Sequence, residues 1–224
     1  MFKDQLQQEF YVLDHFIELA VNQSPFTSYS DKEFIFAAIV SFVDEIRKSL
    51  SAVNAYEIIE CKLVPVPPEQ VELWELNIES VWRRLISDLS KLLDRAETCG
   101  KSNCSLQQLK EYCLRPENRV LFPGQETDPL IAAIDDLYQR YETVISRTTR
   151  NEQIAHHDLN ALRSNPPSFI SLKAVNELIE DTTKVVSEIG SKLFPLDVSF
   201  PSIEDYQHYY ESAIMSMLGH EEIT

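Results

Sequence analysis

The sequence predicts an all-α protein, an up-and-down helical bundle built from long antiparallel helices. Only four glycines occur in 224 residues, and no segment alternates apolar and polar residues over the length of a strand. Long stretches instead repeat apolar residues at intervals of three and four positions, which is the spacing of one helix face. Prolines separate these stretches and mark the connections between helices.

The length and composition favour one domain. A chain of 224 residues with 44% hydrophobic content can bury one sizeable core, whereas two full domains would be cramped. We expect a single domain over residues 1–224 with a core at about 31–194. A helix at 3–22 and another at 202–218 would be appendages to this core.

The first elements follow from apolar spacing and start signals. Apolar residues at helical spacing predict the helix at 3–22, and Pro25 follows it. Ser30 and Glu33 have the spacing of a capping box ahead of a helix that continues towards Ile59. Three prolines between 65 and 68 then break the chain.

The middle of the chain predicts a long helix and a short one. The long helix runs from Val71 to Leu92, with Gly100 as its expected C-terminal cap. Ser105 and Gln108 suggest a second capping box, which opens a short helix through Cys113. Residues 115–127 contain two prolines and a glycine and are expected to form a loop.

The next helix carries the most informative part of the sequence. Asp128 and Pro129 form a start signal, because Asp accepts from free amides and Pro suits the first turn. From Leu130 an apolar stripe continues to Leu162, and Asn151 occupies one of its positions. Two further helices are expected at 172–193 and from about Ser202 towards Gly219.

Two tryptophans and a tyrosine-rich terminal helix are expected to pack. Trp74 and Trp82 lie at helical spacing and indicate core positions. The terminal helix carries several tyrosines and methionines, which would either pack onto the bundle or contact a partner: Tyr206, Tyr209, Tyr210, Met215 and Met217.

The charge limits the classes of function. A net charge of −16 argues against non-specific coating of nucleic acid, which relies on clustered Lys and Arg. Between residues 138 and 165, however, four arginines outnumber three carboxylates, giving a local balance of +1. An acidic protein with such a cationic strip can still contact a few phosphates.

The seven residues from Arg150 to His156, Arg-Asn-Glu-Gln-Ile-Ala-His, combine a permanent cation, the Asn151 carboxamide and a titratable imidazole. This combination suits phosphodiester cleavage. A guanidinium can hold a phosphate with two hydrogen bonds, and an imidazole can take or give a proton near neutral pH.

Helix geometry restricts how Arg150 and His156 could cooperate. Six positions correspond to about 120° in direction and about 9 Å in rise, so a straight helix does not aim both side chains at one phosphate. His157 lies only about 20° from Arg150 in direction, although about 10 Å along the axis. Either the helix is irregular around Thr148 and Thr149, or Arg150 of one copy works beside His156 of another.

Other interpretations of these residues stay open at this level. Asn151 either orients Arg150 or is a buried amide bonded to a neighbouring helix. His156, His157 and Asp158 could ligate a metal, but adjacent histidines on a helix diverge by about 100° and no further ligand pair is present, so we expect neither metal nor cofactor.

The four cysteines form no zinc-type pairs and are expected to be reduced: Cys61, Cys99, Cys104 and Cys113. No apolar run approaches the roughly 18 residues of a membrane span, and the start of the chain lacks a signal-peptide pattern. We therefore expect a cytoplasmic protein without a membrane partner.

An arginine followed by a polar residue and a histidine four to six positions on resembles the signature of the HEPN superfamily. Upstream, residues 88–95 and 105–109 resemble helices of the abortive-infection, AbiU2-like branch. That branch joins them to an Ile-Ala-His-x-Asp segment, which 154–158 matches. The resemblance extends from about residue 34 to 193.

This resemblance implies a bundle that dimerises and brings two motif copies into one cleft, with metal-independent endoribonuclease activity in many members. Arg150 would then hold the scissile phosphate, His156 would act as acid or base, and Asn151 would support them, with His157 and Asp158 as further supporting residues. The implied partners are RNA, a second copy of the chain and a cognate inhibitor protein.

The implied role is that of a toxin-antitoxin or abortive-infection component in antiviral defence. Some HEPN members are inactive, which leaves the alternative of a non-catalytic dimeric module that binds RNA or a partner protein.

Overall fold

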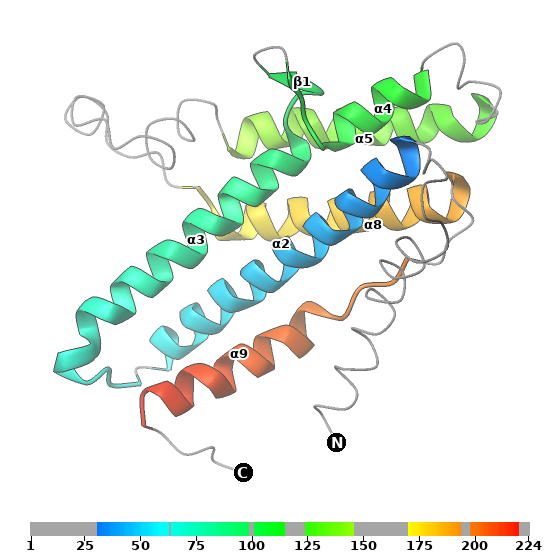
Figure 1. Cartoon of the computed structure of the whole chain (residues 1–224). Helices are drawn as coiled ribbons and strands as arrows, with labels where there is room; N and C mark the ends of the chain where they lie inside the picture. The colour runs from blue at the N-terminus through cyan, green and yellow to red at the C-terminus, as the bar shows by residue number, and fades with distance from the viewer. Residues whose placement is uncertain are drawn as a thin grey trace, which may run out of the picture.

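The computed structural model describes residues 31–62, 64–98, 101–114, 124–145, 170–193 and 198–219, and within them nearly all secondary structure is helical. The long helices are α2 (Asp31–Cys61), α3 (Val71–Leu93), α5 (Gly124–Val144), α8 (Leu172–Leu193) and α9 (Ile203–Met217). Shorter elements are the 3-10 helix η1 (Pro68–Gln70) and the helix α4 (Leu106–Leu114). The predicted all-α fold is confirmed (Figure 1).

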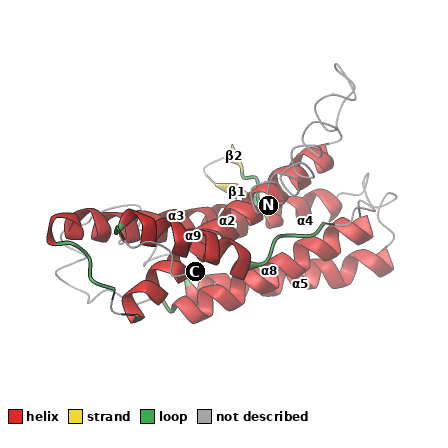
Figure 2. Ribbon diagram, turned by 90° about the horizontal axis from the view of Figure 1, so that it is seen from below, coloured by secondary structure: helices red, strands yellow, loops and turns green. Residues whose placement is uncertain are grey.

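The helix α2 is central to the bundle, since it packs against α3, α8 and α9, while α5 pairs with α8 (Figures 1 and 2). Side-chain contacts give the directions. Arg84 pairs with Glu45 at 2.5 Å and the indole of Trp74 donates to Glu60 at 3.5 Å, so α3 runs antiparallel to α2. The long helices therefore form the expected up-and-down arrangement.

The buried apolar residues form two clusters. The larger cluster gathers side chains from the first half of α2, the second half of α3, and from α4, α5 and α8. The smaller cluster joins the second half of α2 to the start of α3 and the end of α9 through Tyr56, Ile59, Trp74, Ile214 and Leu218. The two ends of α2 thus belong to different packing units.

Apolar spacing identified the core face of α5 correctly. Leu130, Ile134, Leu137 and Tyr141 are all buried, as the stripe predicts. The bounds of α8 agree with the predicted helix at 172–193. Trp74 is buried and Trp82 is partly buried against the larger cluster, which confirms their expected packing.

The ends of α5 differ from the prediction. The helix begins at Gly124, four residues before the expected start at Asp128, and Pro129 lies inside it. So close to the N-terminus of the helix, a proline removes few helical hydrogen bonds. The helix can therefore begin before Pro129, and the proline is not a reliable marker of its first turn. The helix α5 ends at Val144, whereas the apolar stripe of the sequence continues to Leu162, through residues that lie outside the described part of the chain.

The connection after α3 contains a small hairpin that the sequence patterns did not predict. The helix ends at Leu93, and Asp94 adopts an extended backbone with φ −68° and ψ 172°, so Gly100 is not its cap. The strands β1 (Glu97–Thr98) and β2 (Lys101–Ser102) then pair antiparallel, with Glu97 opposite Ser102. The X-Gly dipeptide between them was the available signal for a tight hairpin.

The predicted cap at Ser105 is confirmed, and the structure adds a cap at Ser202, where the sequence predicted only the start of a helix. The amide of Gln108 donates to Ser105 Oγ at 3.3 Å, and the amide of Asp205 donates to Ser202 Oγ at 3.0 Å. At the other end of α9, Gly219 has a φ of 77°, a left-handed conformation that favours glycine. The predicted helix at 3–22 and the Ser30 cap lie outside the described residues.

Candidate functional site

The predicted site residues all lie outside the part of the chain that the structure describes: Arg150, Asn151, His156, His157 and Asp158. They belong to residues 146–169, which connect α5 to α8. The structure describes the helices that precede and follow this connection, α5 and α8.

On the α5 side, the chain enters the connection from a well-packed turn. Tyr141 and Ile145 are almost completely buried, and the amide of Ile145 donates to the Tyr141 carbonyl at 2.8 Å. Burial of both side chains in the larger cluster fixes the end of α5.

On the α8 side, Ser171 caps the first turn. Its hydroxyl accepts from the amide of Ala174 at 3.4 Å, and its carbonyl accepts from the amide of Val175 at 3.0 Å. Val175 is fully buried. The motif-bearing segment is therefore anchored at both ends by neighbouring antiparallel helices.

An ion-pair cluster joins these two helices. Arg140 Nη1 of α5 lies 2.7 Å from Asp181 Oδ2 of α8, and Lys184 Nζ lies 3.1 Å from Asp181 Oδ1. The hydrogen bond from Arg140 is the main cause that lowers the pKa of Asp181. Arg140 was counted in the cationic strip, but its charge is largely neutralised by this partner.

Arg95 is a cation that the sequence patterns did not single out. Its exposed guanidinium donates from Nε to Tyr138 Oη of α5 at 3.3 Å, and this hydrogen bond is the main cause that raises the pKa of Arg95. Within the described ranges it has no ion-pair partner. No local signal could have found this contact, because 43 residues separate the two side chains.

A buried polar network joins α2 to the start of α9. The hydroxyl of Tyr206 donates to Asp44 Oδ1 at 2.8 Å, and Lys48 Nζ lies 2.6 Å from Asp44 Oδ2. Arg47 Nη2 donates to the carbonyl of Pro201 at 2.6 Å. Burial is the main cause that raises the pKa of Tyr206, so its hydroxyl stays protonated.

This network has a structural role, since most of its polar atoms bond to one another, although the buried Nε of Arg47 has no hydrogen-bond partner among the described residues. Arg47 Nη1 also donates to Thr183 Oγ1 of α8 at 3.3 Å, and the guanidinium lies 5.7 Å from the centre of the Phe200 ring. Burial lowers the pKa of Arg47. The network therefore connects α2, α8 and the entry to α9, and it leaves little access for a substrate.

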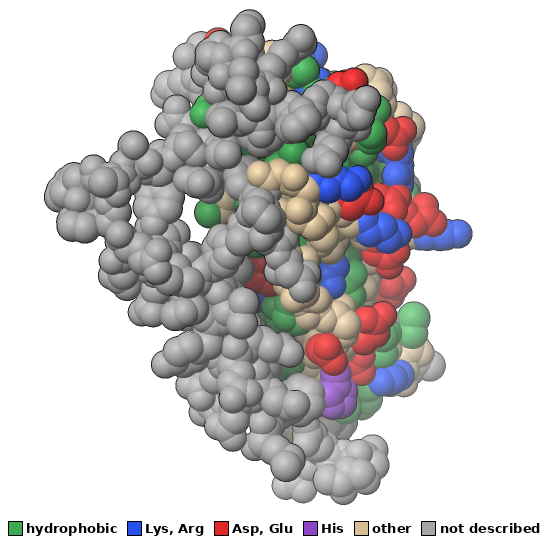
Figure 3. All heavy atoms as spheres, turned by 90° about the vertical axis from the view of Figure 1, so that its right-hand side faces the viewer, with side chains coloured by type: hydrophobic (Ala, Val, Ile, Leu, Met, Phe, Trp, Pro, Cys, Tyr) green, Lys and Arg blue, Asp and Glu red, His purple; other side chains and the backbone are tan. Residues whose placement is uncertain are grey.

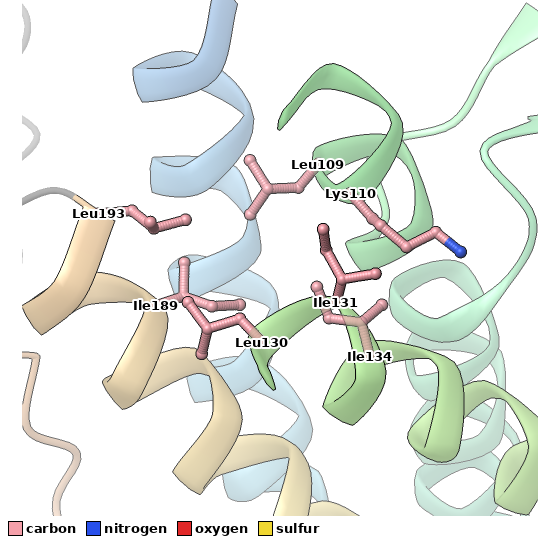
Figure 4. Close-up of a pocket in the computed structure, with 7 residues that line it drawn as sticks. All are labelled: Leu109, Lys110, Leu130, Ile131, Ile134, Ile189 and Leu193. Carbon is pink, nitrogen blue, oxygen red and sulfur yellow. The ribbon is translucent and has the colours of Figure 1, made fainter. Parts of the chain in front are cut away.

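A small apolar hollow lies at the opposite end of the α5–α8 pair from the motif connection (Figure 4). Its lining comes from α4, α5 and α8: Leu109, Lys110, Leu130, Ile131, Ile134, Ile189 and Leu193. Lys110 is its only charged residue, and Nζ pairs with Asp135 at 2.5 Å. The hollow offers no set of groups suited to catalysis.

The remaining chemistry-bearing groups form no metal site in the described part of the chain. No group of three His, Cys, Asp or Glu side chains that could hold a metal ion occurs among the residues with described placement. Cys61 is exposed and Cys104 is partly buried, and burial raises the pKa of the Cys104 thiol. In the same part of the chain, no helix is both long enough and apolar enough to cross a membrane.

Comparison with protein families identifies the chain. The model of the HEPN family described as AbiU2 matches residues 66–211, which is more than half of the sequence. The match begins just before η1, extends into α9 and includes Arg150 to Asp158, although it leaves out α2. No curated protein and no solved structure matches. The resemblance predicted from the sequence is confirmed, and the chain belongs to the AbiU2 family of the HEPN superfamily.

Proposed function

We propose that this protein is a metal-independent endoribonuclease of the toxin or anti-phage type, with its active site shared between two copies of the chain. The observation that carries the proposal is the Arg150–Asn151–x4–His156 motif in a chain that belongs to a HEPN family. Fold membership alone would not assign an activity, so the residues of the motif are essential to the argument.

The proposed reaction is an attack by the ribose 2′-hydroxyl on the adjacent phosphorus. His156 removes or returns a proton, and the guanidinium of Arg150 stabilises the negative charge on the phosphoryl oxygens. The bond to the 5′-oxygen breaks, which leaves a 2′,3′-cyclic phosphate and a 5′-hydroxyl. DNA would not be cut, because it lacks the 2′-hydroxyl.

The other motif residues have supporting roles in this proposal. The Asn151 amide orients Arg150 or a phosphate oxygen, while His157 and Asp158 assist His156 by hydrogen bonding or by charge. No metal or cofactor takes part. Arg95 is a further candidate for a phosphate contact, because its exposed cation lies against α5 and forms no ion pair within 4 Å among the described residues, although, beyond the effect of its hydrogen bond to α5, Glu142 and Asp94 lie near enough to raise its pKa.

The biological role that we propose is abortive infection, in which cleavage of cellular RNA in the cytoplasm halts an infected cell. Such an activity requires restraint in healthy cells, so a cognate inhibitor protein is part of the proposal. The family description supports this role.

The direct test incubates the purified protein with total cellular RNA under excess chelator, beside Arg150→Ala and His156→Ala. We expect chelator-resistant cleavage that both substitutions reduce by about a hundredfold or more. The cleaved ends should carry cyclic phosphates. Equal cleavage by the wild type and both variants would place the activity elsewhere or in a contaminant.

A mixing experiment tests whether the site is shared. Arg150→Ala and His156→Ala chains are each inactive, but a mixed dimer contains one composite site with both native residues. Equal mixing and exchange should restore about a quarter of the wild-type activity if Arg150 and His156 act from different copies. No recovery, despite proven exchange of subunits, would assign both residues to one chain.

The net charge of −16, which disfavours broad contact with a polyanion, keeps a second candidate open: a non-catalytic dimeric module that binds RNA or a partner protein. The first experiment separates the two functions. If no RNA is cut by the wild type while a labelled RNA or a partner binds, the binding module replaces the ribonuclease. Loss of RNA binding in Arg95→Ala, with unchanged folding, would then identify the RNA-facing side.

A further inference from the structure

The start of α3 has an unusual surface. Val71, Leu73 and Leu76 are 41%, 56% and 53% exposed, and they account for three of the six large apolar side chains exposed in the described part of the chain. Trp74 turns into the smaller cluster and is buried, so Leu73 and Leu76 lie on faces directed away from the bundle. Leu73 and Leu76 are three positions apart and form a short apolar ridge on one face of α3, whereas Val71 lies about 160° around the helix from Leu73.

Exposed carboxylates lie near this ridge in the chain. Glu69, Glu72 and Glu75 are exposed, and none of them has an ion-pair partner among the residues that the structure describes. From residue 57 to 79 the sequence has six glutamates and a single cation, Lys62, which pairs with Glu211 at 3.2 Å. We call Val71, Leu73 and Leu76 with these three glutamates the α3 patch.

The second half of the same helix differs. Arg83 pairs with Glu79, Arg84 pairs with Glu45, and Lys91 lies 2.7 Å from Asp88 Oδ1. The face shown in Figure 3 likewise carries acidic and basic side chains beside one another. Unpaired negative charge beside exposed leucines is therefore a property of the α3 patch and not of the whole helix.

We propose that the α3 patch is a docking site for a basic, amphipathic protein segment, whose apolar side chains cover Leu73 and Leu76 while its Lys or Arg side chains pair with Glu69, Glu72 and Glu75. Burial of the leucines supplies affinity, and the carboxylates select the partner by charge. The patch lies on α3, and the segment that carries Arg150 and His156 follows α5 in the chain.

Charge complementarity excludes the other occupants. Nucleic acids and anionic membrane surfaces are repelled by the unpaired glutamates. A second copy meeting this patch symmetrically would place the same glutamates opposite one another, which costs free energy. A basic protein segment satisfies both the apolar and the acidic parts of the surface.

The test uses the full chain and two synthetic helical peptides of about 16 residues, long enough to form several turns. Both peptides carry leucines at the same helical spacing, with lysines on the polar face of one and glutamates on the other. Binding is measured by fluorescence anisotropy and calorimetry. We expect one lysine peptide per chain, affinity that falls with added salt, and no binding of the glutamate peptide.

Variants separate docking from non-specific attraction of cations. Leu73→Ser with Leu76→Ser keeps every charge and should weaken binding of the lysine peptide by at least about tenfold. Glu72→Gln with Glu75→Gln should weaken binding and reduce its dependence on salt. Met217→Ser, which changes an exposed apolar residue on α9, is the matched control and should bind normally.

Three results would overturn the proposal. The lysine peptide could fail to bind, it could bind the leucine variant as tightly as the wild type, or the glutamate peptide could bind equally well. Sedimentation without peptide tests whether a second copy of the chain occupies the patch instead. If the wild type self-associates and the leucine variant does not, the occupant is a second copy and the proposal is wrong.

Discussion

At the residue scale, Asp44 is the acceptor that joins two partners in the buried network, the Tyr206 hydroxyl and the Lys48 ammonium group. Asp44→Ala removes the acceptor for Tyr206 and the counter-charge of Lys48 while Arg47 stays buried. We expect the free energy of unfolding to fall by about 3 kcal/mol, since breaking a buried pair leaves uncompensated groups. Urea denaturation measures this loss.

An exposed ion pair provides the control for Asp44. Lys91 pairs with Asp88 on the surface of α3, and its side chain is more than half exposed. Lys91→Ala should change the free energy of unfolding by less than about 0.5 kcal/mol. Similar losses in both variants would contradict the special role of the buried network.

The pKa of Tyr206 predicts a loss of stability in alkali. Burial, followed by the charge of Asp44, raises the pKa of this phenol above its ordinary value of 10.0. The folded state therefore holds the proton at pH values where the unfolded chain releases it. This contribution to stability is complete below pH 10 and is lost as the pH rises above that value.

Urea denaturation of the wild type and Tyr206→Phe at several pH values from 8 to about 11 tests this prediction. Phe cannot ionise, so the variant should be less stable at pH 8, where it lacks the bond to Asp44, and should lose less stability in alkali. Tyr56 and Tyr210 also have raised pKa values, so some alkaline loss persists. Parallel curves would exclude Tyr206 as the cause.

At the element scale, α9 depends on its N-terminal cap. Ser202 Oγ accepts from the amide of Asp205 at 3.0 Å, and Tyr206 begins the contact with α2 one residue later. Ser202→Ala should lower the free energy of unfolding by about 1 kcal/mol, because a helix-terminal amide loses its acceptor. Thermal and urea denaturation measure the loss.

Ser216→Ala is the matched control on the same helix. Ser216 lies exposed in the last turn of α9, so its substitution removes only a solvated hydroxyl. An equal effect of the two substitutions would show that the hydroxyl of Ser202 does not act as a cap.

The scale of elements also shows where local patterns succeed. The stripe of α5 identified Leu130, Ile134, Leu137 and Tyr141 as core residues because helical periodicity is a local property. The start of α5 was predicted wrongly, since Pro129 is tolerated within the helix, and the apolar stripe did not mark the end of α5 at Val144. Termini depend on contacts with other elements as well as on propensity.

At the scale of the whole molecule, two apolar clusters predict two regions of different stability. Trp74 lies in the smaller cluster with Ile214 and Leu218 of α9, whereas Leu89 lies in the larger cluster. Trp74→Ala should therefore raise native-state hydrogen exchange in α9 much more than in α5 and α8. Leu89→Ala should raise exchange in α5 and α8.

Mass spectrometry of exchanged peptides locates the effect of each substitution. Both are expected to cost about 3 kcal/mol or more, as is usual for large-to-small changes in a core. A uniform rise in exchange for both variants would show that the molecule opens as one cooperative unit.

The sequence by itself determined the helical class, the core face of α5, the cap at Ser105 and the Arg150–His156 motif with its family. Each of these depends on residues close together in the chain, such as Ser105 and Gln108. The motif also suggested a site shared between two copies, because Arg150 and His156 are six positions apart and would point about 120° away from each other on a straight helix.

Only the tertiary structure decided which charged groups are paired and which apolar side chains are buried. Arg140 is neutralised by Asp181, 41 residues away, and Asp44 receives Tyr206 from 162 residues away, whereas Glu72 and Glu75 acquire no ion-pair partner among the described residues. Leu73 and Leu76 stay exposed although their spacing resembles that of core residues. The reason is physical: burial and pairing depend on which helix faces meet, and that arises from packing between distant segments.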